Sequence, residues 1–195
     1  ALFDCGVGYN SRVLIQGPGQ QGLCNTIASK QAGASLIIVT GTNKDVKRLA
    51  VAKNLGADVV INVQEEDPLE KIMEVTGGEG VDVSLDCTAG AGTIPVLLGI
   101  EALKRKGGTL QIQGEDVPDF PNFPLGKIGN KYITVKAARG HNYESCELAL
   151  QQLNSGRFDI GQITTHKFAL KDTHEAINAV GGSGDVIHVS LMPWS

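Results

Sequence analysis

The sequence predicts an α/β protein built on a six-stranded, doubly wound parallel sheet, followed by a separate strand–helix–strand segment. Six short runs rich in apolar and β-branched residues alternate with helical patterns up to residue 156. Such alternation implies parallel strands joined by crossover helices. A glycine-rich turn follows the first run, and after residue 156 the order becomes strand, helix, strand. We therefore expect a sheet domain over residues 12–156, a closing segment over 157–195, and the remnant of a preceding segment in 1–11.

The predicted elements are separated by turn residues, several of them glycine. The six strands of the sheet are expected at residues 12–17, 36–41, 58–63, 81–87, 108–114 and 132–138. Helices are expected at residues 20–32, 46–55, 68–75, 93–103 and 144–154. Residues 115–131 carry three of the seven prolines and are predicted to be a loop with at most short structure. The closing segment is expected to hold strands near 163–170 and 185–191 around a helix at 171–180.

Composition and charge narrow the function classes. The net charge of −4 gives no support for a nucleic-acid-binding surface. No apolar run reaches the ~18 residues that a membrane-spanning helix needs, and no signal peptide is recognised. The four cysteines are scattered and form no C-x-x-C pair. We therefore expect a cytoplasmic protein with reduced thiols and with neither nucleic-acid nor membrane partners.

The stretch "VLIQGPGQQGL" holds three glycines at the spacing G-x-G-x-x-G. In a glycine-rich chain this spacing alone is equally typical of a tight turn. Here the loop follows a predicted strand and opens a predicted helix, which is the context that dinucleotide binding requires. Gly17 permits the turn, Gly19 lets the backbone approach a pyrophosphate, and Gly22 allows close helix–strand packing. The amides of Gly19, Gln20 and Gln21 are the expected phosphate donors at the helix N-terminus.

The end of the second predicted strand leaves the choice between NAD and NADP open. NAD-binding sites usually carry an acidic residue about 20 residues after the glycines, bonded to the ribose hydroxyls. Here the strand ends in Gly41, Thr42 and Asn43, with no acid at its tip. Asp45 follows, surrounded by Arg48 and two lysines. These residues are either a tip that accepts the 2′-phosphate of NADP or the solvated start of a helix.

Several stretches carry a family resemblance. The glycine loop is followed by five segments whose sequences are typical of one superfamily: "KRLAVAKNLGADVVINV", "GGEGVDVSLDCTAG", "GGTLQIQG", "ITTHKFALKDTHEAINAV" and "GDVIHVSL". Together they resemble the medium-chain dehydrogenase/reductase superfamily, and within it the zinc-type alcohol, polyol and threonine dehydrogenases. The resemblance extends over almost the whole chain from Arg12 onward.

The resemblance implies a Rossmann-type domain with a cofactor cleft at the carboxyl ends of its strands. Carried over residue by residue, Cys87 and Thr88 lie beside the adenosine portion of the cofactor, and His188 stands where many members have an Arg or Lys against the pyrophosphate. His188 is equally interpretable as a histidine that alternates outward on a strand. The nicotinamide side is lined, largely through backbone, by Ile112, Gln113, Ala137 and Ala138.

The activity implied for the parent enzyme is hydride transfer between an alcohol or polyol and NAD(P). In the resembling family a zinc ion polarises the substrate oxygen, and its ligands lie in a catalytic domain that precedes the cofactor domain. None of those ligands is recognised in this chain, and a single cysteine such as Cys5 does not make a zinc site. The closing segment of the chain would belong to that catalytic domain. We therefore expect the chain alone to bind cofactor without oxidising alcohols.

Other interpretations remain beside this one. The alternatives are a zinc-independent, quinone-reductase-like oxidoreductase and a stand-alone nucleotide-sensing module. A homodimer is expected through residues 117–138, because members of the family pair cofactor domains at a sheet edge. His141, His166 and His174 show no metal-ligand spacing. The basic run at 104–106 ends a predicted helix, where cations complement the helix dipole.

Overall fold

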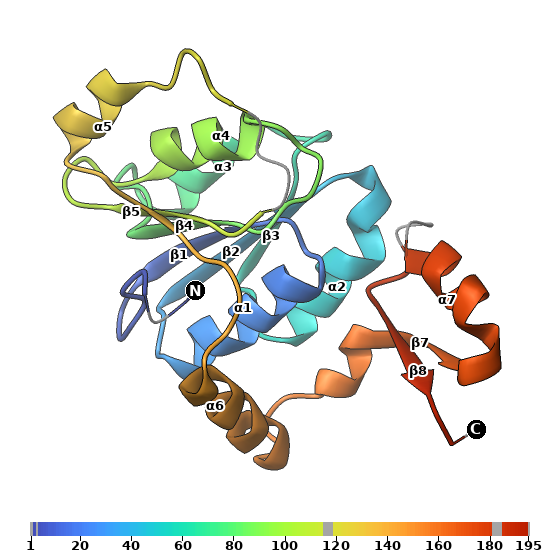
Figure 1. The fold of residues 1–195 in the computed structure, drawn as a ribbon. Coiled ribbons are helices and arrows are strands. Elements are labelled where there is room, and N and C mark those ends of the chain that lie inside the picture. The colour runs from blue at the N-terminus through green and yellow to red at the C-terminus, as the bar shows by residue number, and fades with distance from the viewer. Residues whose placement is uncertain (1, 3, 115–118, 181–184, 195) are drawn as a thin grey trace.

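The computed structural model describes residues 2, 4–114, 119–180 and 185–194, and it confirms the predicted sheet. Six parallel strands lie in the order β3-β2-β1-β4-β5-β6, which is a doubly wound arrangement (Figure 1). The strands are β1 (Arg12–Gln16), β2 (Leu36–Gly41), β3 (Val59–Asn62), β4 (Val83–Asp86), β5 (Thr109–Ile112) and β6 (Thr134–Ala137). The strand order reverses between β1 and β4, and this is where open α/β sheets bind ligands.

Helices cover both faces of the sheet and enclose two apolar cores. The helices are α1 (Gln20–Gln31), α2 (Val46–Asn54), α3 (Pro68–Val75), α4 (Ile94–Ala102), α5 (Leu125–Lys131) and α6 (Tyr143–Asn154). One core packs α1 and α2 against one face, and the other packs α3 and α4 against the opposite face. Because strand side chains alternate, Val13 and Ile15 of β1 belong to the first core while Leu14 belongs to the second. All three are fully buried, because both faces of β1 are covered, and this is why the sequence of the strand has consecutive apolar residues.

Two details of the sequence prediction are corrected around β6. The strand begins at Thr134 rather than at Tyr132, because Tyr132 ends α5 in a left-handed conformation with φ of 53°. The basic run at 104–106 does not cap α4 as predicted. Lys104 pairs instead with Asp82 at 2.9 Å. The cation at the end of α4 is Lys131, whose Nζ donates to the carbonyl oxygens of Ile100 and Glu101 at 2.7 and 2.9 Å.

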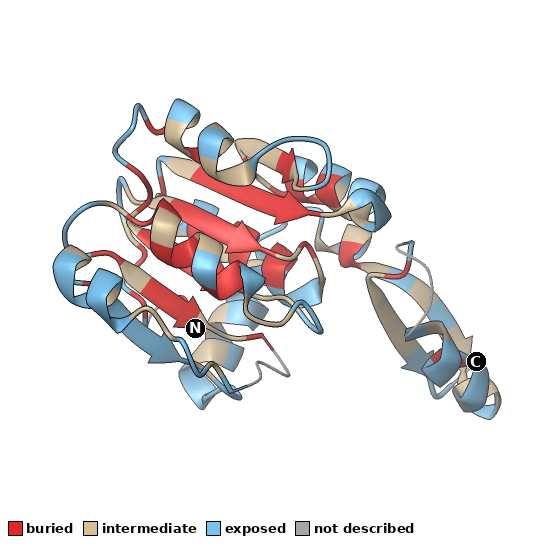
Figure 2. Ribbon diagram, turned by 90° about the horizontal axis from the view of Figure 1, so that it is seen from above, coloured by how far each residue is buried: buried red, intermediate tan, exposed pale blue. Residues whose placement is uncertain are grey.

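The end of the chain forms a small unit of its own, which we call the C-terminal unit: β7 (Thr164–Ala169), α7 (Thr173–Val180) and β8 (His188–Met192). Its two strands pair in parallel, and α7 supplies the crossover connection that parallel neighbours need. The unit projects from the sheet domain and is much less buried than the domain (Figure 2). Residues just before β8 contact α2: Lys47 pairs with Asp185 at 2.7 Å, and Arg48 donates to the carbonyl of Val186.

In the described ranges, no helix has both the length and the apolar character that crossing a membrane would take.

Candidate cofactor-binding site

The strand register sets the predicted site residues side by side at one edge of the sheet. Five neighbouring strands, β2, β1, β4, β5 and β6, each contribute one residue to a line of register partners. In that strand order the partners are Thr40, Gln16, Asp86, Ile112 and Ala137. The residues that directly follow them therefore lie along a single row, which we call the strand-end row: Gly41, Gly17, Cys87, Gln113 and Ala138. Most of the residues that the sequence nominates for the site are in this row or next to it.

The first glycine of the loop makes the sharp turn out of β1. Gly17 has φ of +91°, a conformation that favours glycine, and its amide donates to the carbonyl oxygen of Thr40 at 3.0 Å. A Cβ atom on Gly17 would lie 3.0 Å from Cγ2 of Thr88 and 3.1 Å from the carbonyl oxygen of Cys87. The loop therefore packs directly against the end of β4.

The middle of the loop is open. A Cβ atom on Gly19 would meet no protein atom within 4 Å. Gly19 is also the N-cap of α1 and leaves the first turn of the helix without a side-chain cap or an acidic residue. Uncapped amides at a helix N-terminus, beside an open glycine, fit the pyrophosphate of a dinucleotide. The hollow at this point has a volume of about 220 Å³ and is lined by Gly19, Gln20, Gln21, Cys87, Thr88 and Ala89.

At the tip of β2 the polar side chains bond to one another. Asp45 accepts hydrogen bonds from the amide and the hydroxyl of Thr42 at 3.0 and 2.8 Å, and from Arg48 at 2.9 Å. The guanidinium of Arg48 also donates to the carbonyl of Val186. Cofactor binding by Arg48 stays a prediction; in the structure its Nη1 bonds Asp45 and its Nη2 bonds Val186.

A buried amide that the sequence analysis missed connects three elements of the site. Nδ2 of Asn25, on α1, donates to Oε1 of Gln113 at 2.9 Å and contacts Sγ of Cys87 at 3.4 Å. Burial raises the pKa of the Cys87 thiol to about 12, although the contact with Asn25 acts in the opposite direction. Cys87 is therefore a neutral side chain that lines the site rather than a nucleophile. The available signal was a buried Asn on the inward face of a helix that begins at the glycine loop.

Asp86 was also missed. It ends β4 and is fully buried. Its Oδ1 accepts hydrogen bonds from the amide and hydroxyl of Thr88 at 3.0 and 2.7 Å, which fixes the start of the loop after β4. Its Oδ2 has no hydrogen-bond partner among the described residues. The signal for it was an acidic residue at the end of an otherwise apolar strand.

His188 lies apart from the strand-end row. It begins β8, and its Nδ1 is 3.4 Å from the hydroxyl oxygens of both Thr164 and Ser190. Its role at the pyrophosphate stays a prediction. Nor do the side chains in the described ranges fit a zinc ion, because no three His, Cys, Asp or Glu residues there come together. Cys5 is buried, and its thiol donates to the carbonyl of Leu2.

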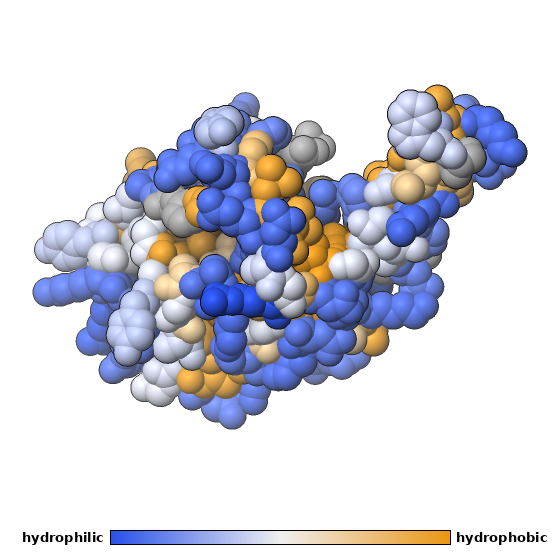
Figure 3. All heavy atoms as spheres, turned by 90° about the horizontal axis from the view of Figure 1, so that it is seen from below, coloured by the Kyte–Doolittle hydropathy of each residue, from blue (hydrophilic) through white to orange (hydrophobic). Residues whose placement is uncertain are grey.

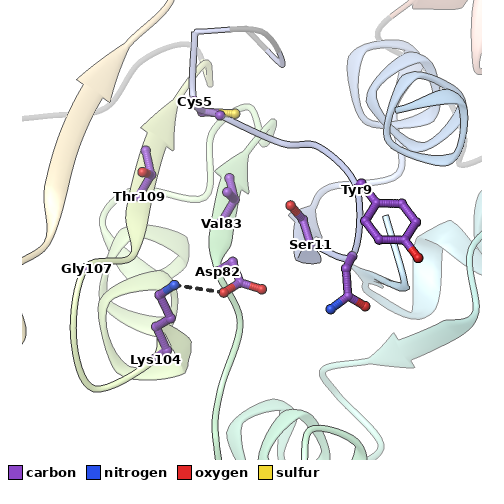
Figure 4. A pocket seen from close by; sticks show the side chains of 10 residues that line it. Cys5, Tyr9, Ser11, Asp82, Val83, Lys104, Gly107 and Thr109 are labelled. Atoms are coloured by element: carbon purple, nitrogen blue, oxygen red, sulfur yellow. Dashed lines mark hydrogen bonds and ion pairs between the residues drawn. The ribbon is translucent and has the colours of Figure 1, made fainter. Parts of the chain in front are cut away.

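A larger hollow of about 390 Å³ lies at the opposite edge of the sheet, where β1, β4 and β5 begin. Figure 4 shows it from close by. The two charges within it, Asp82 and Lys104, are already paired, and Asp82 also accepts from the amide of Arg12 at 2.8 Å. Open α/β sheets bind ligands at the carboxyl ends of their strands, so the glycine-loop edge is the candidate site.

Comparisons with known proteins agree with this geometry. Residues 22–155 match the family described as zinc-binding dehydrogenase. The chain is 32% identical to the sorbitol dehydrogenase of Halalkalibacterium halodurans over 99% of its own length and 55% of that protein. It is 31% identical to an alcohol dehydrogenase of Cupriavidus necator, covering 96% of this chain and 50% of that one.

A solved structure shares the fold. The alcohol dehydrogenase of Thermus sp. ATN1 superposes with a TM-score of 0.86 and 26% identity, over 98% of this chain and 53% of that chain. The chain thus spans about half the length of the relatives it matches. From its glycine loop, its strand order and these matches, the chain belongs to the zinc-binding dehydrogenases, the zinc-type alcohol and polyol dehydrogenases of the medium-chain dehydrogenase/reductase superfamily.

Proposed function

We propose that the chain is the NAD(P)-binding part of an alcohol or polyol dehydrogenase. The observation that carries the proposal is the strand-end row with an open glycine loop at the point where the strand order reverses. The relatives are sorbitol and alcohol dehydrogenases, so the substrate we propose for the whole enzyme is a small alcohol or polyol.

The role of the residues in this proposal is binding and orientation. The amides of Gly19, Gln20 and Gln21 would hold the pyrophosphate, because they lie at the uncapped start of α1. The ends of β4, β5 and β6 would place the ribose and the nicotinamide along the row. The residues proposed there are Cys87, Thr88, Ile112, Gln113, Ala137 and Ala138. The bound cofactor would accept or donate the hydride.

The test is a titration of the 195-residue chain with NADH and NADPH, followed by fluorescence. We expect Gly19→Val to abolish saturable binding of both without changing the melting temperature, because the new side chain fills the pyrophosphate space and its Cβ atom would meet no protein atom within 4 Å. Gly126→Val is the matched control, since Gly126 is also open but lies on α5. Equal binding by wild type and Gly19→Val would contradict the proposal.

We also propose that the chain alone does not oxidise alcohols. The described residues offer no metal site. Apolar side chains of the C-terminal unit are exposed, and we propose that a further domain of the whole enzyme covers them. Leu170, Ile177 and Val180 are more than half exposed, and Figure 3 shows apolar side chains at the surface of this unit. Elemental analysis and an NADH-formation assay over a panel of alcohols and polyols test this. Stoichiometric zinc together with turnover would contradict it.

A homodimer through the edge of the sheet is a further part of the proposal. β6 is the last strand in the order, and all four of its residues are exposed, which leaves an unpaired edge. Residues 117 and 118 of the expected interface lie outside the described residues. Light scattering should give twice the chain mass for the wild type and a monomer for Val135→Lys. A wild-type monomer would contradict the dimer.

We also propose a cytoplasmic location; the free thiols of all four cysteines support it.

A further inference from the structure

We propose that the tip of β2 is a 2′-phosphate site, so that the cofactor of this chain is NADP(H) rather than NAD(H). The inference rests on the proposed function, because it concerns the adenosine end of the same cofactor. Three features of the tip support it. Gly41 occupies the position that would carry an acid, and packing leaves no room for a side chain there. The carboxylate of Asp45 is already hydrogen-bonded, and the exposed side chains of Asn43 and Lys44 are donors.

The position for the acid is closed by packing. β2 ends at Gly41, which has no side chain to accept hydrogen bonds from ribose hydroxyls. A Cβ atom there would lie 3.0 Å from Cγ of Pro18 and 3.0 Å from Cβ of Asp45. Pro18 is part of the glycine loop, so the tip of β2 and the loop are in direct contact. A carboxylate at this position would require one of them to shift.

The one carboxylate in residues 41–48 is already engaged. Both oxygens of Asp45 accept hydrogen bonds, from the amide and hydroxyl of Thr42 and from Arg48. Its side chain is only 14% exposed. Arg48, held in turn by the carbonyl of Val186, therefore acts as a positioning residue that keeps Asp45 away from the ribose. NAD-binding sites of this fold use a carboxylate that is free to accept from the 2′-hydroxyl, and this tip does not present one.

The side chains left at the surface of the tip are donors. Oδ1 of Asn43 accepts from Nδ2 of Asn62 at 2.6 Å, which leaves the NH₂ group of this exposed residue available as a donor. Lys44 is exposed beside it. The tip thus offers an ammonium and an amide N–H to a dianionic phosphate. Charge-assisted hydrogen bonds of this kind are about twice as strong as neutral ones, whereas a ribose hydroxyl gains little from an ammonium group.

The experiment compares the two cofactors in the wild-type chain by fluorescence titration, with 2′-AMP and 5′-AMP as competitors. We expect NADPH to bind at least about tenfold more tightly than NADH, a difference of about 1.4 kcal/mol, and 2′-AMP to compete better than 5′-AMP. Lys44→Gln should weaken NADPH binding and leave NADH binding unchanged. Lys71→Gln, which removes a cation on α3, is the matched control and should change neither.

The outcomes separate the inference from the proposed function. Binding of NADH as tight as, or tighter than, that of NADPH would overturn the 2′-phosphate site while leaving the cofactor domain in place. A folded chain that binds neither dinucleotide would overturn both. If Lys44→Gln weakened both cofactors equally, the assignment of Lys44 to the 2′-phosphate would be wrong.

Discussion

A Cβ atom on Gly22 would lie 2.0 Å from the carbonyl oxygen of Gly17. Gly22 is in the first turn of α1, and Gly17 is the first residue after β1. The contact therefore sets how closely the helix approaches the strand, and with it the shape of the glycine loop. No side chain fits between the two residues.

The first prediction follows from this contact. Gly22→Ala should destabilise the fold by about 1–3 kcal/mol, the usual cost of overpacking a tight interior, and should also weaken NADPH binding because the loop must move. Gly126→Ala is the control, since its Cβ would meet nothing and helices favour alanine. Urea unfolding measures both variants. A Gly22→Ala protein as stable as the wild type would show that the loop relaxes without cost.

The second prediction concerns the charge cluster at the amino edge of the sheet. Burial alone would raise the pKa of Asp82, but hydrogen bonds from the Arg12 amide, from Lys104 and from the Arg12 side chain outweigh it and hold the pKa below its ordinary value of 3.8. The carboxylate therefore stabilises the fold at all pH values above 3.8, and this contribution is lost as the pH falls through the lower, folded-state pKa.

Asp82→Asn should accordingly lower the free energy of unfolding at pH 7 by about 1–3 kcal/mol, as expected for losing hydrogen bonds to a charged group. The difference from the wild type should shrink on acidification below the ordinary pKa. Glu79→Gln removes the other acidic partner of Arg12, which is 73% exposed, and should have little effect. A difference between Asp82→Asn and wild type that grew toward low pH would contradict the sign of the shift.

The third prediction tests the bridge between α1 and the ends of β4 and β5. Asn25→Ala removes the 2.9 Å hydrogen bond to Oε1 of Gln113 and leaves that part-buried oxygen with only the thiol of Cys87 at 3.9 Å. Losing such a hydrogen bond costs about 0.5–1.5 kcal/mol. We expect a lower melting temperature and weaker cofactor binding. Asn54→Ala removes an exposed amide that bonds Gln162 and should leave both unchanged. Equal stability of the two variants would mean that the bridge contributes nothing.

The fourth prediction concerns thiol reactivity. Because the pKa of Cys87 is raised to about 12, almost none of it is thiolate at pH 8. Iodoacetamide should therefore label Cys146, which is exposed, much faster than Cys87 in the folded protein. Peptide mapping by mass spectrometry gives the two rates, and urea should make them similar. Comparable labelling of both thiols in the folded chain would contradict a partly buried, neutral Cys87.

The sequence by itself was enough to predict the type and the order of the elements. β2 and α3 have the residues that the apolar patterns predicted, and most other boundaries differ by one or two positions. Local rules decide such features: a run of apolar residues predicts a buried strand, and Asp67 before Pro68 begins a helix by accepting from the amides of Leu69 and Glu70. The glycine loop could be found for the same reason, since its function depends on residues within one short turn.

The tertiary structure decided what residues far apart in the sequence do together. Three contacts join separate elements in this way. Asn25 bonds Gln113, Lys131 rather than the run at 104–106 caps α4, and Arg48 bonds the carbonyl of Val186. The local sequence pattern gives no information on such contacts, because they depend on which helix packs beside which strand and on the positions of the side chains in the folded protein. For the same reason the sequence left the cofactor choice open at Asp45. Only the tertiary structure shows that both oxygens of this carboxylate are engaged, by Thr42 and by Arg48.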